Sequence, residues 1–474
     1  MLNNLTITQL REKLLKKEIS SLEIVEYYLK QIEERDNKLN SYITVNGEKA
    51  LKQAKEFDND FNNQKEKRLG GIPLGIKDVF STKDILTTCA SHILDGYTPV
   101  YESTVTQRLL NEGAIFLGKT NLDQFCHGSS TVTSYYGTTR NPHNIERLPG
   151  GSSGGSAAAT AADLCAGSLG TETAGSIRLP ASWCGVVGLK PSYGRVPRYG
   201  VLAMGSSLDS PGPITKSVED SALILSLIAG YDPKDFSSYN TPINDYLKDI
   251  DISKIKGMKI GIPKEYLELD IEKGVLENFN MSVDILKKLG ANIEYINILD
   301  PNYGMSVYTI TCRSEVSSNL ARYDGTRYGL EGSDKTTVKT YYESTRGQGF
   351  GQEPKRRVMT GTYSLSAGYA DEYFKKSEQV RQLIKQDFEK ILKGYDCLIS
   401  PTTPTVALKD EDADNPLFGE MADILAEGSS EAGLPAISIP NGMSQGLPTG
   451  IQFIGNTLQE QTVINASKAL EENS

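Results

Sequence analysis

The 474-residue chain carries 50 Lys and Arg side chains against 60 Asp and Glu, for a net charge of −10. A protein that binds nucleic acid over a broad surface carries the opposite sign, so we expect any RNA contact to be local or made by a partner. Hydrophobic residues make up 38% of the chain, and no apolar run reaches membrane-spanning length. The six cysteines include no CxxC pair, which indicates a reducing compartment and thiols that serve as small core residues.

Two amphipathic helices are predicted at the N-terminus. Thr6 with Gln9, and Ser20 with Glu23, each form the pattern of a capping box, in which two side chains satisfy backbone N–H groups at a helix start. A folded start of this kind is unlike a signal peptide. We therefore expect a cytoplasmic protein, or an organelle protein whose transit peptide has been removed.

From about residue 70 onward, short apolar runs alternate with helical patterns, which predicts a layered α/β architecture. Strands are expected over 71–80, 114–120, 257–266, 292–298 and 395–402, and helices over 156–162, about 272–289 and about 371–392. The segments 344–354 and 409–416 have the composition of exposed loops. The length would allow about three average domains. Because we find no internal repeat and no clear linker, we predict a single domain over 1–474, with the N-terminal helices (about 1–65) packed on it.

Two motifs in the chain match known sites in their letters but lack the required context. Residues 113–120 read GAIFLGKT, the spacing of a phosphate-binding loop, yet their middle letters predict a buried strand after a helix. Residues 151–155 read GSSGG, the spacing of the nucleophile elbow of α/β-hydrolases, which needs a histidine later in the chain. The three histidines (His92, His127 and His143) all come earlier and, like the cysteines, show no metal-ligand spacing. We expect no metal site. A Ser-His-Asp site in another chain order would have only these three histidines to draw on, so a base other than histidine is favoured.

The run of glycine and serine at 150–156 has the composition of a flexible linker. A linker would lead into open polar sequence, whereas this run passes directly into an Ala-rich helix. A second stretch of small residues, GSLGTETAGSIRLPAS (167–182), follows that helix, and its glycines allow the backbone to approach a ligand closely. Two such loops could converge with a serine from each. Lysine can serve as their base when burial or a nearby cation favours its neutral form, and Lys77 ends a strongly apolar run.

Together these segments resemble the amidase signature family. Lys77 stands in GIPLGIKD, Ser152 in GGSSGG and Ser176 in TETAGSIR, in the order of that family's three motifs. The resemblance implies a large mixed β-sheet flanked by helices on both faces. It also implies catalysis by a Ser–cis-Ser–Lys triad, with a cis peptide bond between Gly151 and Ser152.

The resemblance also implies a role for each site residue. Ser176 would be the nucleophile, and Ser152 would relay its proton to Lys77. Ser153 would help to hold these residues in place without taking part in proton transfer. The oxyanion hole would consist of backbone N–H groups from Thr173, Ala174, Gly175 and Ser176.

Two further positions match residues that bind an amino-acid substrate in the resembled family. Arg356 in KRR would bind the α-carboxylate, with Arg357 as the less favoured choice, and Asp423 in MADIL would bind the α-ammonium. By residue pattern alone, a solvated basic cluster and a helix-surface acid are the alternatives.

Later segments of the chain narrow the resemblance to the A subunits of tRNA-dependent glutamine amidotransferases. The segments are 194–213, 317–329, 355–381 and 433–455. In such a complex the A subunit hydrolyses glutamine, and the B subunit uses ATP and Mg to activate Glu-tRNA(Gln), and often Asp-tRNA(Asn), for amidation. A small C subunit tethers the two. We accordingly expect no cofactor in this chain, B and C subunits as partners in a heterotrimer, and charged tRNA bound mainly through the B subunit.

The sequence departs from the family pattern around the triad but not in it. Ala174 stands where glycine is usual, which would be costly if the backbone there were left-handed. Gln124 and His127 replace an acid and an apolar residue, and Thr309 replaces a tyrosine. A stand-alone amidase acting on another small amide is therefore the alternative, and an assembly scaffold without catalysis is opposed by the intact triad.

Overall fold

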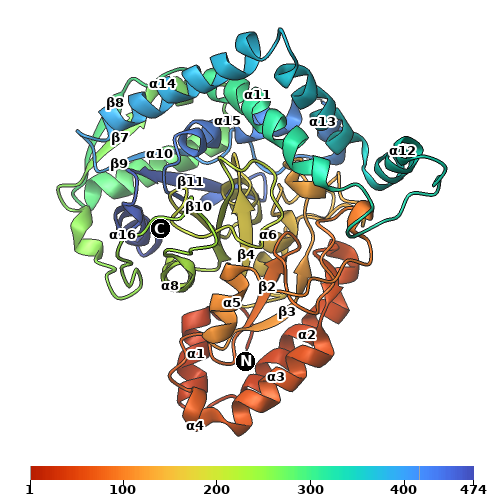
Figure 1. Ribbon diagram of the computed structural model, residues 1–474. Coiled ribbons are helices and arrows are strands. Elements are labelled where there is room, and N and C mark those ends of the chain that lie inside the picture. The colour runs from red at the N-terminus through yellow and green to blue at the C-terminus, as the bar shows by residue number, and fades with distance from the viewer. Residues whose placement is uncertain (1, 416) are drawn as a thin grey trace.

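The computed structural model describes residues 2–415 and 417–474, in which one eleven-stranded sheet runs through the molecule (Figure 1). The strand order is β1-β3-β2-β4-β6-β5-β10-β11-β9-β7-β8. The strands are β1 (Tyr42–Val45), β2 (Pro73–Lys77), β3 (Ile115–Thr120), β4 (Gly167–Glu172), β5 (Val187–Lys190), β6 (Ser210–Thr215), β7 (Lys259–Pro263), β8 (Asn292–Ile296), β9 (Cys397–Pro401), β10 (Ala436–Ser444) and β11 (Leu447–Gly455).

The sheet is mixed, as the family resemblance implies. The edge strand β1 is antiparallel to β3, next to it β3, β2 and β4 are parallel neighbours, and at the other end β9, β7 and β8 are parallel neighbours. The central strands from β4 through β6, β5, β10 and β11 to β9 pair antiparallel. In each parallel group, two consecutive strands are joined through a helix: β2 with β3, and β7 with β8. A crossover helix of this kind is the usual way to bring the next strand back parallel to the first.

Helices cover both faces of this sheet. They are α1 (Ile7–Leu15), α2 (Ser21–Leu39), α3 (Gly47–Asn59), α4 (Phe61–Gln64), α5 (Thr104–Asn111), α6 (Gly154–Ala161), α7 (Arg178–Cys184), α8 (Val218–Ile228), α9 (Lys264–Leu267), α10 (Lys273–Lys288), α11 (Asn302–Asn319), α12 (Val338–Gly349), α13 (Gln352–Leu365), α14 (Lys376–Ile391), α15 (Phe418–Glu431) and α16 (Glu460–Glu471). On β11, a Cβ at Gly450 would meet Ser182 of α7, whereas one at Gly455 would meet Val463 of α16. Positions five apart on a strand point to opposite faces, so α7 and α16 lie on opposite sides.

The four N-terminal helices form the lower end of the molecule in Figure 1 and share the main hydrophobic core with the sheet. Both predicted capping boxes are present, at Thr6 with Gln9 and at Ser20 with Glu23. The aspartate Asp220 at the start of α8 accepts hydrogen bonds from the first N–H groups of α1 and so ties that helix to the body of the chain.

One loop prediction is wrong. Residues 344–354 belong to α12 and α13, and only Phe350 and Gly351 lie between the two helices. Tertiary packing overrides the low helix propensity of glycine here, because Gly349 lies against Ile93, and a Cβ at Gly349 would come within 2.7 Å of the isoleucine. The acidic segment 409–416 is exposed at its start and includes a 3₁₀ turn at Asp410–Asp414, whereas Pro416 lies outside the described residues.

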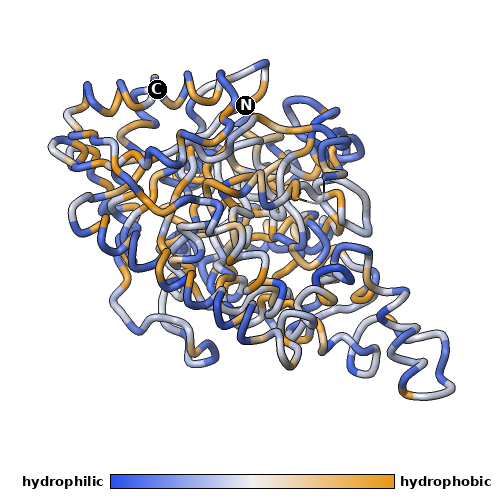
Figure 2. The backbone as a smooth tube through the Cα atoms, turned by 90° about the horizontal axis from the view of Figure 1, so that it is seen from above, coloured by the Kyte–Doolittle hydropathy of each residue, from blue (hydrophilic) through white to orange (hydrophobic). Residues whose placement is uncertain are grey.

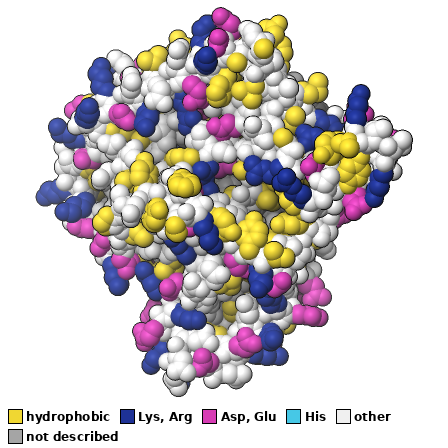
Figure 3. All heavy atoms as spheres, in the orientation of Figure 1, with side chains coloured by type: hydrophobic (Ala, Val, Ile, Leu, Met, Phe, Trp, Pro, Cys, Tyr) yellow, Lys and Arg dark blue, Asp and Glu magenta, His cyan; other side chains and the backbone are white. Residues whose placement is uncertain are grey.

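The surface mixes polar with apolar residues and carries charges of both signs. Along the outer helices, hydrophilic and hydrophobic positions alternate (Figure 2), and Lys and Arg are intermingled with Asp and Glu on the face shown in Figure 3. All six cysteines are free and buried, which confirms their expected place in the core. Among the described residues, no helix combines the length and the apolarity that crossing a membrane requires.

Candidate active site

Lys77 lies at the carboxyl end of β2, in the parallel end of the sheet, and its side chain is fully buried. Its Nζ lies 2.8 Å from Ser152 Oγ, 2.9 Å from Ser153 Oγ and 3.0 Å from Thr171 Oγ1. The amine of a buried lysine is thus held among hydroxyl groups and the Thr171 carbonyl, and no carboxylate of the described residues is bonded to it. A neutral lysine in this position can accept the proton of Ser152.

The loop that carries Ser152 is packed into the core and does not serve as a linker. The peptide bond between Gly151 and Ser152 is cis. A Cβ at Gly151 would lie 2.2 Å from Asp123 Oδ2, so only glycine fits. Asp123 is itself held by hydrogen bonds from the backbone of Ser130 and the hydroxyl of Thr133. The predicted Ala-rich helix is α6, which begins within the glycine run at Gly154.

Ser176 lies in the turn between β4 and α7, beside the Ser152 loop. The backbone N–H of Ser153 donates to the carbonyl of Ser176 at 3.2 Å, which joins the two loops. Glu172 accepts the N–H groups of Ile177 and Arg178, both at 3.0 Å, and so holds the other end of the turn. Ser176 is 6% exposed, whereas Lys77 and Ser152 are 0% exposed. Of the three triad residues, Ser176 is therefore the one that a substrate can reach.

The backbone of the same turn has the character of an oxyanion hole. In the described part of the chain, the N–H groups of Thr173, Ala174, Gly175 and Ser176 have no hydrogen-bond acceptor. The Thr173 hydroxyl donates to Asp209 Oδ1 at 2.8 Å, which fixes the first residue of the turn. Ala174 does not have a left-handed φ, so alanine causes no backbone strain at this position. Unused N–H groups next to a serine can stabilise a developing oxyanion.

Asp423, on α15, lies directly against the turn between β4 and α7 that carries Ser176, which we call the nucleophile turn. A Cβ at Gly175 would be 2.1 Å from Asp423 Oδ1, and Ser129 Oγ donates to Oδ2 at 2.8 Å. Oδ1 has no hydrogen-bond partner among the described residues. Burial raises the pKa of this carboxyl well above its usual range. The structure therefore places Asp423 beside the turn that carries Ser176, with one oxygen that has no partner among the described residues, and its role as a substrate ligand stays a prediction.

The two arginines of KRR point in different directions. Arg356 is partly exposed and pairs with Glu353 at 2.6 Å. Arg357 is buried, pairs with Glu353 at 2.6 Å and donates from Nη1 to Tyr308 Oη at 3.4 Å. Arg357 is thus the arginine that faces the interior, and Arg356, the residue preferred from the sequence, faces outward, because adjacent residues lie about 100° apart around a helix. Which of the two binds a substrate stays a prediction.

In a comparison with known families, the family described as Amidase matches residues 23–464. The chain belongs to the amidase family. It is 49% identical over 472 residues to the A subunit of the glutamyl-tRNA(Gln) amidotransferase of Thermoanaerobacter pseudethanolicus, covering 99% of this chain and 96% of the relative. The protein of the same name from Geobacillus kaustophilus is 46% identical over 469 residues, covering 98% and 96% of the two chains.

Two solved structures have the same fold as this amidase-family chain. The A subunit of the glutamyl-tRNA(Gln) amidotransferase of Thermotoga maritima superposes with a TM-score of 0.84 at 37% identity, covering 100% of this chain and 96% of the other. The peptide amidase of Stenotrophomonas maltophilia superposes with a TM-score of 0.85 at 28% identity, covering 99% and 96%.

Sequence reasoning missed several residues that position the site of this amidase-family chain. Asp123 packs against Gly151, Asp209 holds Thr173, and Glu172 closes the nucleophile turn. Each is a buried acid next to a glycine- or serine-rich motif, which is the signal that could have indicated them. The phosphate-loop match is a helix–strand connection, as expected, with Lys119 buried and 3.1 Å from Asp78.

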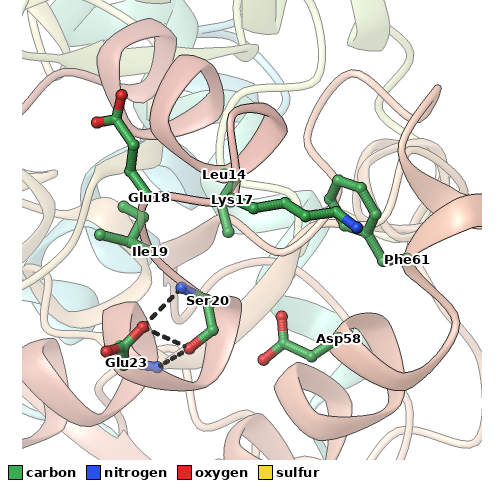
Figure 4. Close-up of a pocket in the computed structure, with 8 residues that line it drawn as sticks. All are labelled: Leu14, Lys17, Glu18, Ile19, Ser20, Glu23, Asp58 and Phe61. Carbon is green, nitrogen blue, oxygen red and sulfur yellow. Dashed lines mark hydrogen bonds between the residues drawn. The ribbon is translucent and has the colours of Figure 1, made fainter.

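A separate pocket lies among the N-terminal helices (Figure 4). It measures about 310 Å³ and is lined by Leu14, Lys17, Glu18, Ile19, Ser20, Glu23, Asp58 and Phe61. Ser20 and Glu23 are bonded to each other as a helix cap, and the Lys17 amine lies 5.1 Å from the centre of the Phe61 ring. None of these lining residues belongs to the candidate site around Lys77, Ser152 and Ser176.

Proposed function

We propose that this chain is the glutamine-hydrolysing subunit of a tRNA-dependent amidotransferase. The observation that carries the proposal is the 2.8 Å contact between Lys77 Nζ and Ser152 Oγ, which follows a cis peptide bond and lies beside the turn of Ser176. The four N–H groups of that turn have no acceptor within the described residues. Relatives named as A subunits of glutamyl-tRNA(Gln) amidotransferases, which match nearly the whole chain, support the choice of complex.

In the proposed first step, Ser176 Oγ attacks the side-chain carboxamide carbon of glutamine. Its proton passes to Ser152 Oγ as the Ser152 proton passes to Lys77 Nζ, which is well placed because Lys77 already contacts Ser152. The oxyanion forms within reach of the N–H groups of residues 173–176, and one such donor is typically worth about 10²–10³ in rate.

The tetrahedral intermediate then collapses to a glutamyl ester on Ser176. The C–N bond breaks, and the proton returns through Ser152 to the nitrogen, which leaves as ammonia. Water attacks the ester by the same route in reverse and releases glutamate.

Recognition of glutamine requires both a cation and an anion in the protein. We assign the α-ammonium to Asp423, whose Oδ1 is unpartnered beside Gly175 among the described residues, and the α-carboxylate to Arg357. Arginine is suited to a carboxylate because its N–H groups form a planar fork.

The partners in this proposal are the B and C subunits of the complex. The B subunit would use ATP and Mg to activate the tRNA-bound carboxylate of Glu-tRNA(Gln), and of Asp-tRNA(Asn) where that is a substrate, and would receive the ammonia. The negative net charge of this chain favours placing most of the tRNA contact on that partner.

The test is ammonia release from glutamine by the purified chain, with and without candidate B and C subunits. Stimulation by the partners, lost in Ser176→Ala, is the expected result. A stand-alone amidase is the second candidate, because the peptide amidase superposes as well as the amidotransferase structure does. Strong hydrolysis of simple amides, weak hydrolysis of glutamine and indifference to partners would establish that alternative.

A further inference from the structure

His127 is a fully buried histidine whose ring makes no hydrogen bond. Its exposure is 0%, and neither Nδ1 nor Nε2 has a partner in residues 2–415 and 417–474. Buried polar side chains nearly always have at least one partner, so an unpartnered imidazole requires an explanation. A histidine that served only to fill the core beside Phe125, whose ring centre is 6.3 Å away, would be expected to bond through at least one nitrogen.

The segment 126–129 runs from the triad to Asp423. Cys126 Sγ lies 3.7 Å from Thr171 Oγ1, the same hydroxyl that lies 3.0 Å from Lys77 Nζ. Two residues beyond His127, Ser129 donates to Asp423 Oδ2. His127 therefore lies between Cys126, which is next to the surroundings of Lys77, and Ser129, which bonds to the proposed ammonium ligand Asp423.

Two arginines, Arg357 and Arg313, are the charged groups that act on His127, and each is also paired with an acid, Glu353 and Glu420 respectively. Burial first, and then the charges of Arg357 and Arg313, hold the pKa of His127 well below its usual range. The ring is therefore neutral at physiological pH, with one N–H to donate. Neighbouring guanidinium groups attract an anion and oppose a cation, so the ligand group that suits this ring is a carboxylate.

An α-amino acid also has an ammonium group, which needs an acid, and α15 provides one. Asp423 Oδ1 is buried and unpartnered within the described residues. An unpartnered acid on one side and an unpartnered imidazole beside two arginines on the other match the two ends of an α-amino acid. The two ends of such a ligand would satisfy groups that the protein alone leaves without partners.

We propose that His127 is a specificity-determining residue that donates one ring N–H to the α-carboxylate of the substrate, alongside Arg357. The inference rests on the proposed glutaminase function and adds a second donor to its carboxylate site. Because the donor acts on bound substrate and not on the reacting carbonyl, its loss changes KM and leaves kcat nearly unaltered.

The test compares three amides in the full chain with its partner subunits present. Glutamine has both charged groups, glutaramate has the carboxylate without the ammonium, and 4-aminobutanamide has the ammonium without the carboxylate. Where turnover is slow, the analogue is measured as a competitive inhibitor of glutamine hydrolysis. The variants are His127→Met, which is apolar and similar in size, His127→Gln, which can restore one donor, and the control His92→Met.

We expect His127→Met to raise KM, or the inhibition constant, about 10- to 100-fold for glutamine and glutaramate, the worth of one hydrogen bond to a charged group. The value for 4-aminobutanamide stays unchanged, His127→Gln recovers part of the loss, and His92→Met matches the wild type. An unaltered KM for glutamine in His127→Met, or an equal loss with all three amides, overturns the inference. Wild-type enzyme without Ser176-dependent glutamine hydrolysis overturns the proposed function, and the inference with it.

Discussion

Replacing Gly175 by alanine adds a single methyl group at the point where the nucleophile turn meets α15. The new Cβ would lie 2.1 Å from Asp423 Oδ1 and 3.3 Å from the Cβ of Ala426. A normal contact needs roughly 1 Å more, so either the Asp423 carboxylate or the turn that carries Ser176 must move by about that distance. Asp423 is held by Ser129, and the turn is held by Glu172, so neither can move without losing a hydrogen bond.

A displacement of about 1 Å in an active site can cost about 10²-fold in rate, equivalent to about 3 kcal/mol. We therefore expect kcat/KM for glutamine to fall about 100-fold in Gly175→Ala. Gly347→Ala is the matched control, because a Cβ there meets nothing within 4 Å, and alanine in a helix is about 1 kcal/mol better than glycine. Steady-state ammonia release and thermal unfolding of both variants provide the comparison. Wild-type activity in a folded Gly175→Ala protein would refute the steric reasoning.

Three further predictions concern the proton path and the buried acids. Ser152→Ala should lower kcat by about 10²–10⁴ with folding intact, because the path from Ser176 to Lys77 is cut; single-turnover kinetics that match the wild type would contradict this relay. Since burial raises the pKa of Asp423 and only the ionised carboxylate pairs with an ammonium, KM for glutamine should fall as pH rises through that pKa, and Asp423→Asn should show a high, flat KM across the same pH series. Burial likewise raises the pKa of Glu427, so the folded chain holds a proton that the unfolded chain releases, and stability falls as pH rises above the unfolded value. Glu427→Gln removes that loss and should be more stable by about 1–3 kcal/mol near neutral pH, a gain that grows with pH in denaturant titrations; a pH-independent difference would argue against a buried proton.

Local patterns predicted much of the architecture. The capping boxes at Thr6 and Ser20, the helix α10 between the strands β7 and β8, and the long helix that contains α14 are all present where they were expected. These features depend on neighbours within a few residues, so their signals are complete in the sequence itself. The loop predicted over 344–354 failed because packing against Ile93 outweighs glycine propensity, and that contact lies about 250 positions away in the chain.

The sequence by itself determined which residues are the candidates for the triad, because Lys77, Ser152 and Ser176 each stand in a motif that allows few alternatives. Only the tertiary structure decided which side chains surround it. Arg357, and not Arg356, is buried because of the rotation of α13 about its axis. That rotation is set where Gly361 packs against the backbone of Arg313. The burial of His127 likewise depends on elements far apart in the chain. The direction in which a helical side chain points, and whether it is buried, depend on how all the elements pack together. The sequence pattern could therefore indicate candidate catalytic residues but could not show which neighbours face them.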